Sequence, residues 1–371
     1  MASFTKRGKT WQYTVSNVVS GKSKPIRKGG FKTKKEAQIA ASEVEANLTR
    51  GIVKKQEEIP FSDYFKEWYE LYKTDITKNT LRHYKYSLNI IREYFPLTLL
   101  QQIDRRSYQK FLNEFGSTKS KETVDKVHSH IKACVRDALD EDIIFKDFTR
   151  NTVVTSKMPE KSTSEKHLNY HDSIVLLNNV YNKLDDGLGY YAILLALTSG
   201  LRYAEIVGLT LSDFDFINNT ISINKTWGHI NGMHDGFGPT KNKSSERIVK
   251  MDKKTMNEFN KLLKSSTGNV HELVFYSPSS KYKVISNANT NKLLRKLLNQ
   301  LNLTPITFHG LRHTHASILI YKREVTINYI SERLGHSDIE TTLKKYTHLL
   351  KELKVEDELR TTNVFDEMYT K

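Results

Sequence analysis

The sequence has little cysteine and no long hydrophobic run. Cys134 is the only cysteine among 371 residues, so no intrachain disulfide framework can form, and a reducing compartment fits this composition. The longest apolar run, YYAILLAL at 190–197, is far shorter than the roughly 20 residues that cross a bilayer. The start, MASFTKRGKTWQY, lacks the apolar core of a signal peptide. We therefore expect a soluble, cytoplasmic protein with no membrane partner.

Acidic residues are in the minority. The formal net charge is +16 and the pI is about 9.5, which points to a polyanionic partner. Residues 1–55 hold 13 Lys or Arg and three Glu, so most of the positive surplus lies there. This basic head suggests a module that binds nucleic acid, and the lesser alternative is a solvated basic tail.

The first segment reads as a small sheet backed by one helix. Apolar and polar residues alternate in TWQYTVSNVV, which predicts a half-buried strand, and PIRKGGF predicts another short strand. Thr33 is a suitable N-cap for a helix that begins KKEAQIAASEVEANL. We expect a three-stranded sheet with basic residues and an aromatic side chain gathered on one face, suited to a DNA groove.

The next segment, residues 61–150, reads as helices only. Ser62 and Asp104 are plausible N-caps, and Tyr84, Leu88 and Ile91 form a helical apolar stripe. The predicted helices span roughly residues 62–73, 80–94, 104–115 and 120–138.

The remainder is mainly helical and follows a Ser- and Thr-rich linker at 155–167. It includes a hairpin pattern, DFDFINNTISINKT, with Asn218 and Asn219 at its turn. The expected fold class is α+β, mostly helical. The expected domains are an arm-type DNA-binding domain at 1–55, a core-binding helical domain at 60–154, and a catalytic domain with a docking tail at 167–371.

The stretch TFHGLRHTHAS raises a choice between a metal and a phosphate. His309 and His313 have the spacing of zinc ligands on a helix, but Gly310 stands where an H-E-x-x-H site needs glutamate. Thr307 can instead cap a helix whose first turn carries His309 and, one turn on, Arg312. Guanidinium grips two phosphate oxygens at once, so phosphate fits better. An H-x-x-R pair alone could also bind a dinucleotide or sulfate.

Other segments supply further candidates, each with a plainer alternative. Arg202 follows a break at Gly200, and Glu205 could orient it, although the two could form an ordinary surface pair. Lys241 and Lys243 lie in a predicted loop, GPTKNKSSERIVKM.

Gly335 is predicted to end a helix and leave His336 beyond its cap. Ser337 and Glu340 are expected to form a capping box for the following helix, which carries Tyr346. Tyr346 could equally be a core tyrosine, because it shares a helical apolar stripe with Ile339, Leu343 and Leu350.

Taken together, these residues resemble the active site of the tyrosine recombinases, specifically the integrases of phages and integrative elements. The matching stretches are TSGLRYAEIVGLTLSDFDF, TKNKSSERIV, TFHGLRHTHAS and LGHSDIETTLKKYTH, and GFKTKKEA resembles an arm-type domain. The resemblance implies a site-specific recombinase that integrates and excises a mobile element or prophage. The catalytic residues that it implies are Arg202, Lys241, His309, Arg312, His336 and Tyr346.

In that resemblance Tyr346 is the nucleophile on a DNA phosphodiester. Arg202 and Arg312 hold the nonbridging oxygens, and His309 is the better candidate to accept the tyrosine proton. Lys241 is the implied general acid, with Lys243 as its rival. His313 and His315 are assigned to packing or to phosphate hydrogen bonds, and Asp213 to bracing the loop.

No metal and no ATP are expected, because the cations cover the phosphate charge and the sequence has no carboxylate cluster or P-loop. The implied partners are double-stranded DNA at core and arm sites, a homotetramer on DNA, an excisionase and a host DNA-bending protein. The tail after Tyr346 is expected to dock on a neighbouring protomer. Candidate DNA contacts are Lys6, Arg7, Lys9, Arg27, Lys28, Lys32, Lys34, Lys35, Lys78, Arg82 and Lys243.

Three alternatives remain open from the sequence, and one is a telomere-resolving relative that forms hairpin ends, although the arm-type head argues against it. A type IB topoisomerase would share the chemistry but relax DNA without choosing a site. A DNA-binding regulator would keep the fold with a vestigial active site.

Overall fold

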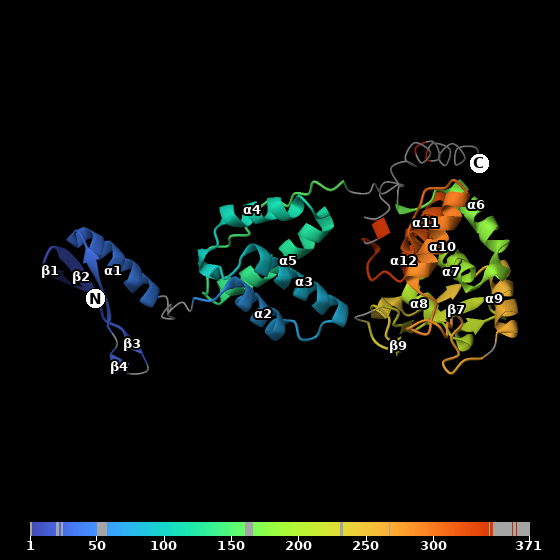
Figure 1. Cartoon of the computed structure of the whole chain (residues 1–371), viewed down its shortest axis with the longest axis horizontal. Coiled ribbons are helices and arrows are strands. Elements are labelled where there is room, and N and C mark those ends of the chain that lie inside the picture. Colours follow the sequence, from blue (N-terminus) through green and yellow to red (C-terminus); the bar gives the residue numbers. More distant parts are fainter. Residues whose placement is uncertain are drawn as a thin grey trace, which may run out of the picture. The chain divides into compact units, whose positions relative to one another are not determined.

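A computed structural model describes most of the chain (Figure 1). The described residues are 2–19, 22, 23, 25–49, 58–159, 166–230, 233–266, 268–340, 342, 343, 358 and 361. Residue contacts divide the chain into two units, Met1–Pro159 and Glu160–Lys371, and each is described by itself. Tyr346 and almost all of the predicted docking tail lie outside the described residues, so both expectations stay predictions, as do the three domain boundaries.

The head forms the expected three-stranded antiparallel sheet, in the order β1-β2-β5, with one helix packed on it. A short hairpin, β3 and β4, lies between β2 and β5 in the chain. Tyr13 and Val15 are buried against Ala41 of the helix. Thr33 caps the helix as predicted, accepting from the backbone N–H of Glu36 at 3.2 Å. The elements are β1 (Ser3–Arg7), β2 (Thr10–Val15), β3 (Val18–Val19), β4 (Lys22–Ser23), β5 (Ile26–Phe31) and α1 (Lys34–Thr49).

The basic residues of the strands divide between the two faces of the sheet, and Lys6, opposite Trp11, and Lys28 share the face of the aromatic residues. Residues opposite each other in an antiparallel pair share a face, and Lys28 lies opposite the buried Tyr13 while Arg27 lies opposite Thr14. The two cations therefore project from opposite faces. Trp11 belongs to the helix side as well, where Lys34 Nζ lies 5.7 Å from its ring centroid.

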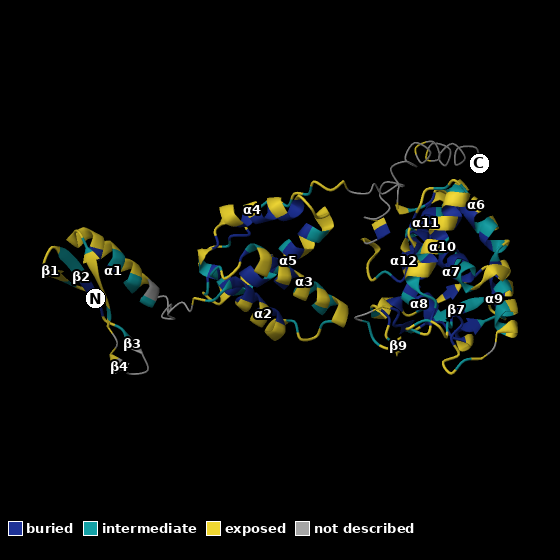
Figure 2. Cartoon of the chain, in the orientation of Figure 1, coloured by how far each residue is buried: buried dark blue, intermediate teal, exposed yellow. Residues whose placement is uncertain are grey.

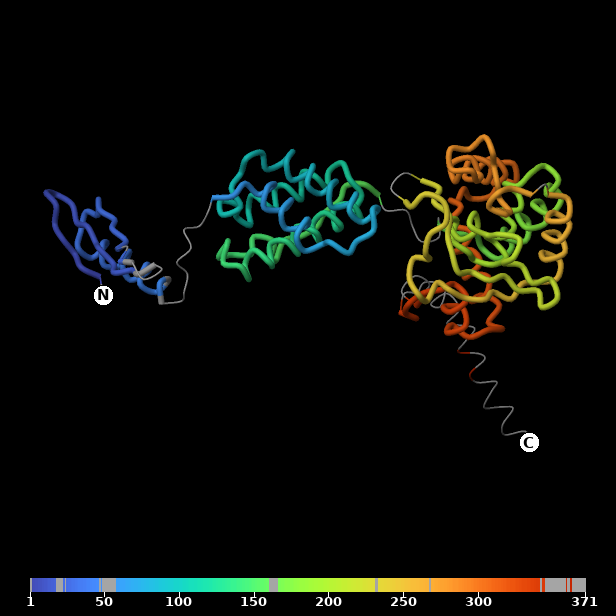
Figure 3. The backbone as a smooth tube through the Cα atoms, turned by 90° about the horizontal axis from the view of Figure 1, so that it is seen from below, coloured from blue at the N-terminus to red at the C-terminus, as the bar shows by residue number. Residues whose placement is uncertain are grey.

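The second segment is a helical bundle, as predicted. Helix α5 contacts α2, α3 and α4, and the backbone trace shows the helices running side by side (Figure 3). Phe61, Phe65 and Trp68 are fully buried in the aromatic core between them. The helices are α2 (Phe61–Tyr72), α3 (Lys78–Tyr94), η1 (Leu100–Gln102), α4 (Arg105–Gly116) and α5 (Lys121–Asp140).

One of the two predicted caps in the bundle is right. Asp104 caps α4, accepting from Ser107 N at 2.7 Å in a reciprocal capping box. Ser62 is not a cap, because α2 begins one residue earlier, at Phe61, with Pro60 at the cap position. Ser62 is buried within the first turn because Phe61, the first residue of the helix, must reach the core. That requirement sets the start of the helix.

The second unit is built around α7, whose residues from Tyr191 to Leu197 are all buried. It contacts α6, α9, α10 and α11, which explains why its sequence is apolar on every side (Figure 2). The helices are α6 (Tyr170–Tyr181), η3 (Leu184–Asp186), α7 (Leu188–Ser199), α8 (Tyr203–Val207), η4 (Leu211–Asp213), η5 (Lys243–Ser245), α9 (Lys253–Ser265), α10 (Asn287–Gln300), α11 (Phe308–Lys322) and α12 (Ile327–Leu334).

Small antiparallel sheets complete this unit, so the α+β, mostly helical fold class is confirmed. The predicted hairpin is present: Phe214 pairs with Ile221, and Asn219 in its turn has a φ of 49°. The sheets have the order β10-β7-β6 and β8-β9. Their strands are β6 (Phe214–Asp215), β7 (Thr220–Ile223), β8 (Thr226–Trp227), β9 (Phe237–Gly238) and β10 (Arg247–Lys250). Across the ranges that the structure describes, none of the helices is long and apolar enough to span a membrane.

Candidate active site

Helix α11 carries the H-x-x-R pair. Thr307 caps the helix as predicted, accepting from Gly310 N at 3.2 Å. Arg312 is buried, with 3% of its surface exposed. Its guanidinium donates to the carbonyl of Gly200 at 2.7 Å and to that of Leu334 at 2.5 Å. These bonds satisfy carbonyls at the C-terminal ends of α7 and α12, where helices leave acceptors unpaired.

Arg202 also binds a carbonyl at the C-terminal end of α12. Gly200 ends α7 in the left-handed conformation, with a φ of 71°, which turns the chain so that Arg202 heads α8. Its NH1 donates to Glu205 at 2.7 Å, so the predicted orienting role of this carboxylate is supported by a direct bond. Its NH2 donates to the carbonyl of Gly335 at 3.0 Å. Arg202 and Arg312 are therefore brought together on neighbouring carbonyls.

His336 follows these carbonyls directly. Gly335 caps α12 in the left-handed region, as predicted, with a φ of 66°. The Nδ1 of His336 is hydrogen-bonded to the hydroxyl of Thr342 at 2.7 Å, which fixes the ring against the segment that leads to Tyr346. The structure thus brings Arg202, Arg312 and His336 together.

The predicted capping box after His336 is wrong. The backbone N–H of Glu340 donates to Asp338 at 2.9 Å, and the chain is helical from residue 339, so Asp338 stands at the cap position expected for Ser337. The helix therefore begins one residue later than predicted, and the order of the candidate catalytic residues is unchanged.

The histidines of α11 have different surroundings. His309 is exposed in the first turn, and its ring stands perpendicular to that of His313 with 5.0 Å between centroids. His315 is buried: its Nδ1 donates to Leu197 O at 2.9 Å and its Nε2 accepts from Arg333 Nε at 3.0 Å. Burial, with Arg333 and Arg312 nearby, lowers the pKa of His315 to about 3. His315 is therefore a neutral packing residue.

The loop with the candidate lysines lies beside Arg202. Ser245, at the end of η5, accepts from Arg202 NH1 at 3.2 Å, and Lys243 begins that turn. Lys241 and Lys243 are both exposed, and within the described ranges neither side chain has a partner that fixes it. The choice between them as general acid therefore stays a prediction.

Two arginines that sequence reasoning missed complete the surroundings of the site. Arg247 NH2 donates to Glu205 at 3.1 Å, and Arg333 NH1 donates to the carbonyl of Lys250 at 2.8 Å. Burial alone would raise the pKa of Glu205, but Arg247 and Arg202 hold that pKa below its usual range. The only sequence signal for Arg333 was its position in the last turn of a predicted helix, where a cation is favourable. No sequence signal pointed to Arg247.

A pocket of about 450 Å³ opens beside His309. It is bordered by the first residues of α10 and α11, including Asn291, which accepts from Phe308 N at 2.8 Å. This hydrogen bond fixes the start of α11. The pocket therefore leaves open space next to the exposed imidazole.

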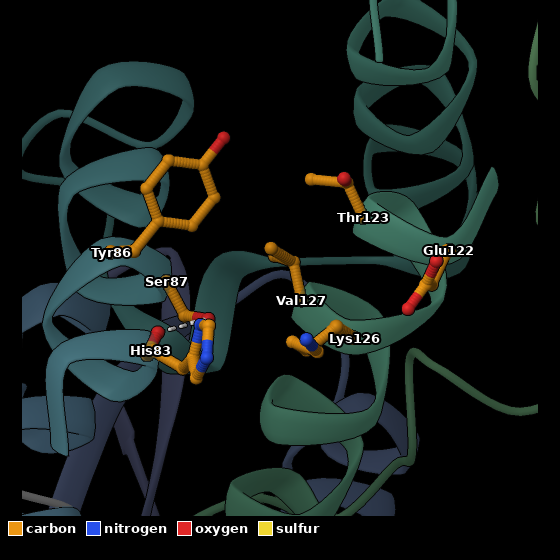
Figure 4. Close-up of a pocket in the computed structure, with 7 residues that line it drawn as sticks. All are labelled: His83, Tyr86, Ser87, Glu122, Thr123, Lys126 and Val127. Carbon is orange, nitrogen blue, oxygen red and sulfur yellow. Dashed lines mark hydrogen bonds between the residues drawn. The ribbon is translucent and has the colours of Figure 1, made fainter. Parts of the chain in front are cut away.

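A second pocket, of about 230 Å³, lies in the helical bundle between α3 and α5 (Figure 4). His83, Tyr86 and Ser87 line one side and Glu122, Thr123, Lys126 and Val127 the other. Burial lowers the pKa of His83, and Lys126 and Arg82 lower it further. The predicted contact Arg82 thus has a basic neighbour, Lys126, that sequence reasoning did not select because it comes from another helix.

The remaining candidate DNA contacts stay predictions, and Lys78, at the start of α3, is exposed. Lys6, Arg7, Lys9, Lys32 and Lys35 are exposed in the head.

Family models match three successive parts of the chain. Residues 170–352 match the phage integrase family, residues 3–48 an arm DNA-binding domain, and residues 60–116 the N-terminal SAM-like domain of phage integrases. The three matches follow the order of the head, the bundle and the second unit.

Curated relatives match over most of their length. The integrase of Staphylococcus phage L54a is 28% identical over 80% of this chain and 90% of its own. The XerC-like tyrosine recombinase of Caldanaerobacter subterraneus subsp. tengcongensis is 25% identical over 95% of each chain.

Solved structures share the fold. The Tn1549 transposon integrase, in complex with a circular intermediate DNA, has a TM-score of 0.64 and 19% identity over 77% of this chain and 94% of its own. A lambda integrase tetramer bound to a Holliday junction has a TM-score of 0.56 and 16% identity over 88% and 93%. Together, the domain matches and the named relatives show that this chain is a tyrosine recombinase of a mobile element and belongs to the phage integrase family.

Proposed function

We propose that this recombinase cuts and rejoins DNA at specific sites through a 3′-phosphotyrosyl bond to Tyr346, with Arg202 and Arg312 holding the scissile phosphate. The observation that carries this assignment is the convergence of the two arginines on the carbonyls of Gly335 and Leu334, directly before His336. Three groups that can bind a phosphate thus meet from α7–α8, α11 and the end of α12.

Arg202 has donors to spare for this task. Its NH1 is engaged by Glu205 and Ser245, and its NH2 by Gly335 O. Within the described residues, its Nε–H and one NH2 hydrogen donate to no partner. Two such donors can grip nonbridging phosphate oxygens and stabilise the charge of the pentacoordinate transition state.

The proposed step balances in atoms and protons. The Tyr346 oxygen attacks phosphorus as its proton passes to His309, and the bond from phosphorus to the 5′-oxygen breaks as that oxygen takes a proton from Lys241. The new phosphotyrosyl bond keeps a phosphodiester-like bond energy. Attack by a different 5′-hydroxyl then rejoins the strands without ATP, and no metal is required in this scheme.

We further propose double-stranded DNA as the partner, bound at a core site by residues 60–371 and at an arm site by the head. Arg82 and Lys126 beside the α3–α5 pocket are proposed to contact core-site phosphates, and the exposed cations of the head are proposed to contact an arm site. Strand exchange joins two sites, so we propose four protomers in the synaptic complex. An excisionase and a host bending protein are proposed accessories, and the cytoplasm is the proposed compartment.

A suicide-substrate experiment tests the assignment. The full chain is mixed in EDTA with nicked DNA that carries its attachment site, so that a cleaved fragment diffuses away and traps the covalent complex. We expect a protein–DNA adduct with wild type and none with Tyr346→Phe, which should still bind the DNA.

The other outcomes separate the rival classes. Binding without an adduct would contradict the proposal and favour a DNA-binding regulator, and relaxation of any plasmid without a specific site would favour a topoisomerase. An adduct that forms only when Mg²⁺ replaces EDTA would overturn the metal-free scheme. No relative or structure named above is a regulator or a topoisomerase.

A further inference from the structure

The C-terminal turn of α12 has an unusual set of partners. Three consecutive carbonyls each accept a hydrogen bond from a different arginine: Arg333 O from Arg247 Nε at 2.7 Å, Leu334 O from Arg312 at 2.5 Å, and Gly335 O from Arg202 at 3.0 Å. These carbonyls lie at the negative end of the helix, where cations bind favourably. Two of the three arginines are the proposed phosphate-binding groups, and the third is Arg247.

Arg247 is hydrogen-bonded to protein acceptors through all three nitrogens of its guanidinium. Its Nε bonds to Arg333 O, its NH1 to Ser245 O at 2.7 Å, and its NH2 to Glu205 at 3.1 Å, while only 8% of its side chain is exposed. All three nitrogens of the guanidinium therefore point at protein acceptors. Such a group is unsuited to gripping a phosphate itself.

Arg247 also shares its acceptors with Arg202. Glu205 accepts from the backbone N–H of Arg202 at 2.9 Å and from both guanidiniums. Ser245 offers its hydroxyl to Arg202 and its carbonyl to Arg247. Removing Arg247 would leave the 1%-exposed carboxylate of Glu205 with one cation, which would draw the guanidinium of Arg202 toward it.

The backbone around this turn leaves little freedom for rearrangement. A Cβ at Gly335 would lie 2.9 Å from Arg247 NH1 and 3.1 Å from Ser245 Cα, so the helix end and the η5 turn are in close contact through the guanidinium. Arg247 therefore fills the space between the loop that carries Lys241 and the helix end that precedes His336.

We propose that Arg247 is a positioning residue of the recombination site. It sets the direction of Arg202 through Glu205 and Ser245, and it fixes the end of α12, and with it His336, through Arg333 O. This inference rests on the proposed function, since it assigns Arg202 and His336 to the scissile phosphate. Small displacements of such groups lower rates by about 10²-fold in enzymes.

The test compares single-turnover adduct formation by wild type, Arg247→Ala and Arg247→Lys at saturating DNA. Each protein is given a normal suicide substrate and one with an uncharged methylphosphonate at the scissile position, which needs less help from a correctly placed cation. We expect Arg247→Ala to form adduct about 10²-fold more slowly on the normal phosphate and to lose much less on the methylphosphonate. Arg247→Lys should fall between, because it keeps the charge beside Glu205 but not the fork of donors.

A matched control separates positioning from stability. Lys225, like Arg247, pairs with a buried carboxylate of the second unit: its Nζ lies 2.5 Å from Asp213. Its other hydrogen bond goes to Asn224 and not to a proposed catalytic residue. Lys225→Met should lower the melting temperature while keeping the ratio of the two rates at the wild-type value.

The failures are distinguishable. Absence of an adduct with wild type on either substrate would overturn the proposed function itself. If wild type forms an adduct and Arg247→Ala forms it at the same rate, the positioning role alone is overturned. The same holds if the variant's rate falls by the same factor on both substrates. If Arg247→Ala does not fold, the rate ratio of Arg247→Lys decides by the same criterion.

Discussion

The guanidinium of Arg312 donates a hydrogen bond of 2.7 Å to the backbone carbonyl of Gly200, which is 112 residues earlier in the chain. This bond ties α11 to the C-terminal end of α7. It also brings the proposed phosphate-binding Arg312 next to the turn that presents Arg202. The fold thus builds one phosphate site from two distant segments by satisfying helix-terminal carbonyls with arginines.

Replacement of Arg312 by lysine tests its place in the site. Lysine has a single charged nitrogen, so it cannot reach Gly200 O, Leu334 O and a phosphate together as a guanidinium can. We expect Arg312→Lys to form adduct at least about 10²-fold more slowly, as measured by single-turnover cleavage of the suicide substrate. Arg295→Lys, at an exposed position of α10, should keep the wild-type rate. A rate for Arg312→Lys within about threefold of wild type would contradict the assignment, because several kcal/mol of charge stabilisation is expected.

Lys241 and Lys243 can be separated by changing the leaving group. A general acid is needed to protonate a departing 5′-oxygen, but a 5′-sulfur leaves readily without one. Lys241→Met should therefore cleave normal DNA at least about 10²-fold more slowly and recover on a 5′-phosphorothiolate substrate. Lys243→Met should show no such recovery. Recovery of Lys243→Met instead would transfer the role to that lysine.

Gly200 should resist replacement by alanine more than a glycine with similar backbone angles. A Cβ at Gly200 would lie 2.8 Å from both His315 Cδ2 and Leu334 Cδ2, in addition to the strain of a φ of 71°. Strain of about 1–2 kcal/mol and overpacking of about 1–3 kcal/mol give an expected loss of about 2–5 kcal/mol in the free energy of unfolding.

Gly236 provides the control for this prediction. Its φ is 72°, but the nearest atom to its Cβ would be 3.8 Å away, so Gly236→Ala should show the strain alone, about 1–2 kcal/mol. Denaturant unfolding of both variants measures the difference. Equal losses would show that the contacts of Gly200 with α11 and α12 can relax.

His315 should make stability depend on pH. Its pKa is about 3 in the folded chain against an ordinary 6.5, so the unfolded chain binds the proton first as the pH falls. The free energy of unfolding should therefore decrease below pH 6.5, by about 1.4 kcal/mol per unit and about 2 kcal/mol at pH 5 from this residue.

Denaturant titrations at several pH values, with His315→Gln beside wild type, isolate this contribution. Between pH 6.5 and pH 5, the free energy of unfolding of His315→Gln should fall less steeply with pH than that of wild type. His171→Gln, at an exposed position of α6, should keep the wild-type dependence. An unchanged slope in His315→Gln would mean that the imidazole takes up its proton in the folded chain.

Lys126 offers a test of the α3–α5 pocket as a DNA contact. Removing one phosphate contact weakens binding and lowers the slope of log affinity against log salt by about one. We expect this change for Lys126→Ala in a binding titration with core-site DNA, and wild-type behaviour for Lys110→Ala on the exposed side of α4. Identical salt slopes for both variants would place the DNA elsewhere on the bundle.

Local signals in the sequence were sufficient for much of the fold, whereas the choice of candidate residues came from the resemblance to the tyrosine recombinases. The predicted caps at Thr33, Asp104 and Thr307 are present because a side-chain oxygen accepts from a backbone N–H three residues later. Such contacts depend only on residues that are close in the sequence. The apolar periodicity of the bundle and the uniform apolarity of α7 have the same local character. Where a cap was misjudged, at Ser62 and Ser337, the observed cap positions, Pro60 and Asp338, stood only two residues and one residue away.

Only the tertiary structure decided which side chains meet. Arg247 and Arg333 O are 86 positions apart, and Arg202 and Gly335 O are 133 apart, so no periodicity connects the members of the arginine cluster. The same holds for Lys126 beside His83, and for the strand register that sets Arg27 opposite Thr14 and Lys28 opposite the buried Tyr13. The sequence by itself determined the helices, their caps and the order of the candidate residues, because these depend on neighbours along the chain. The partners of each arginine were decided by packing, because they depend on where the ends of α7 and α12 leave carbonyls without helical hydrogen bonds.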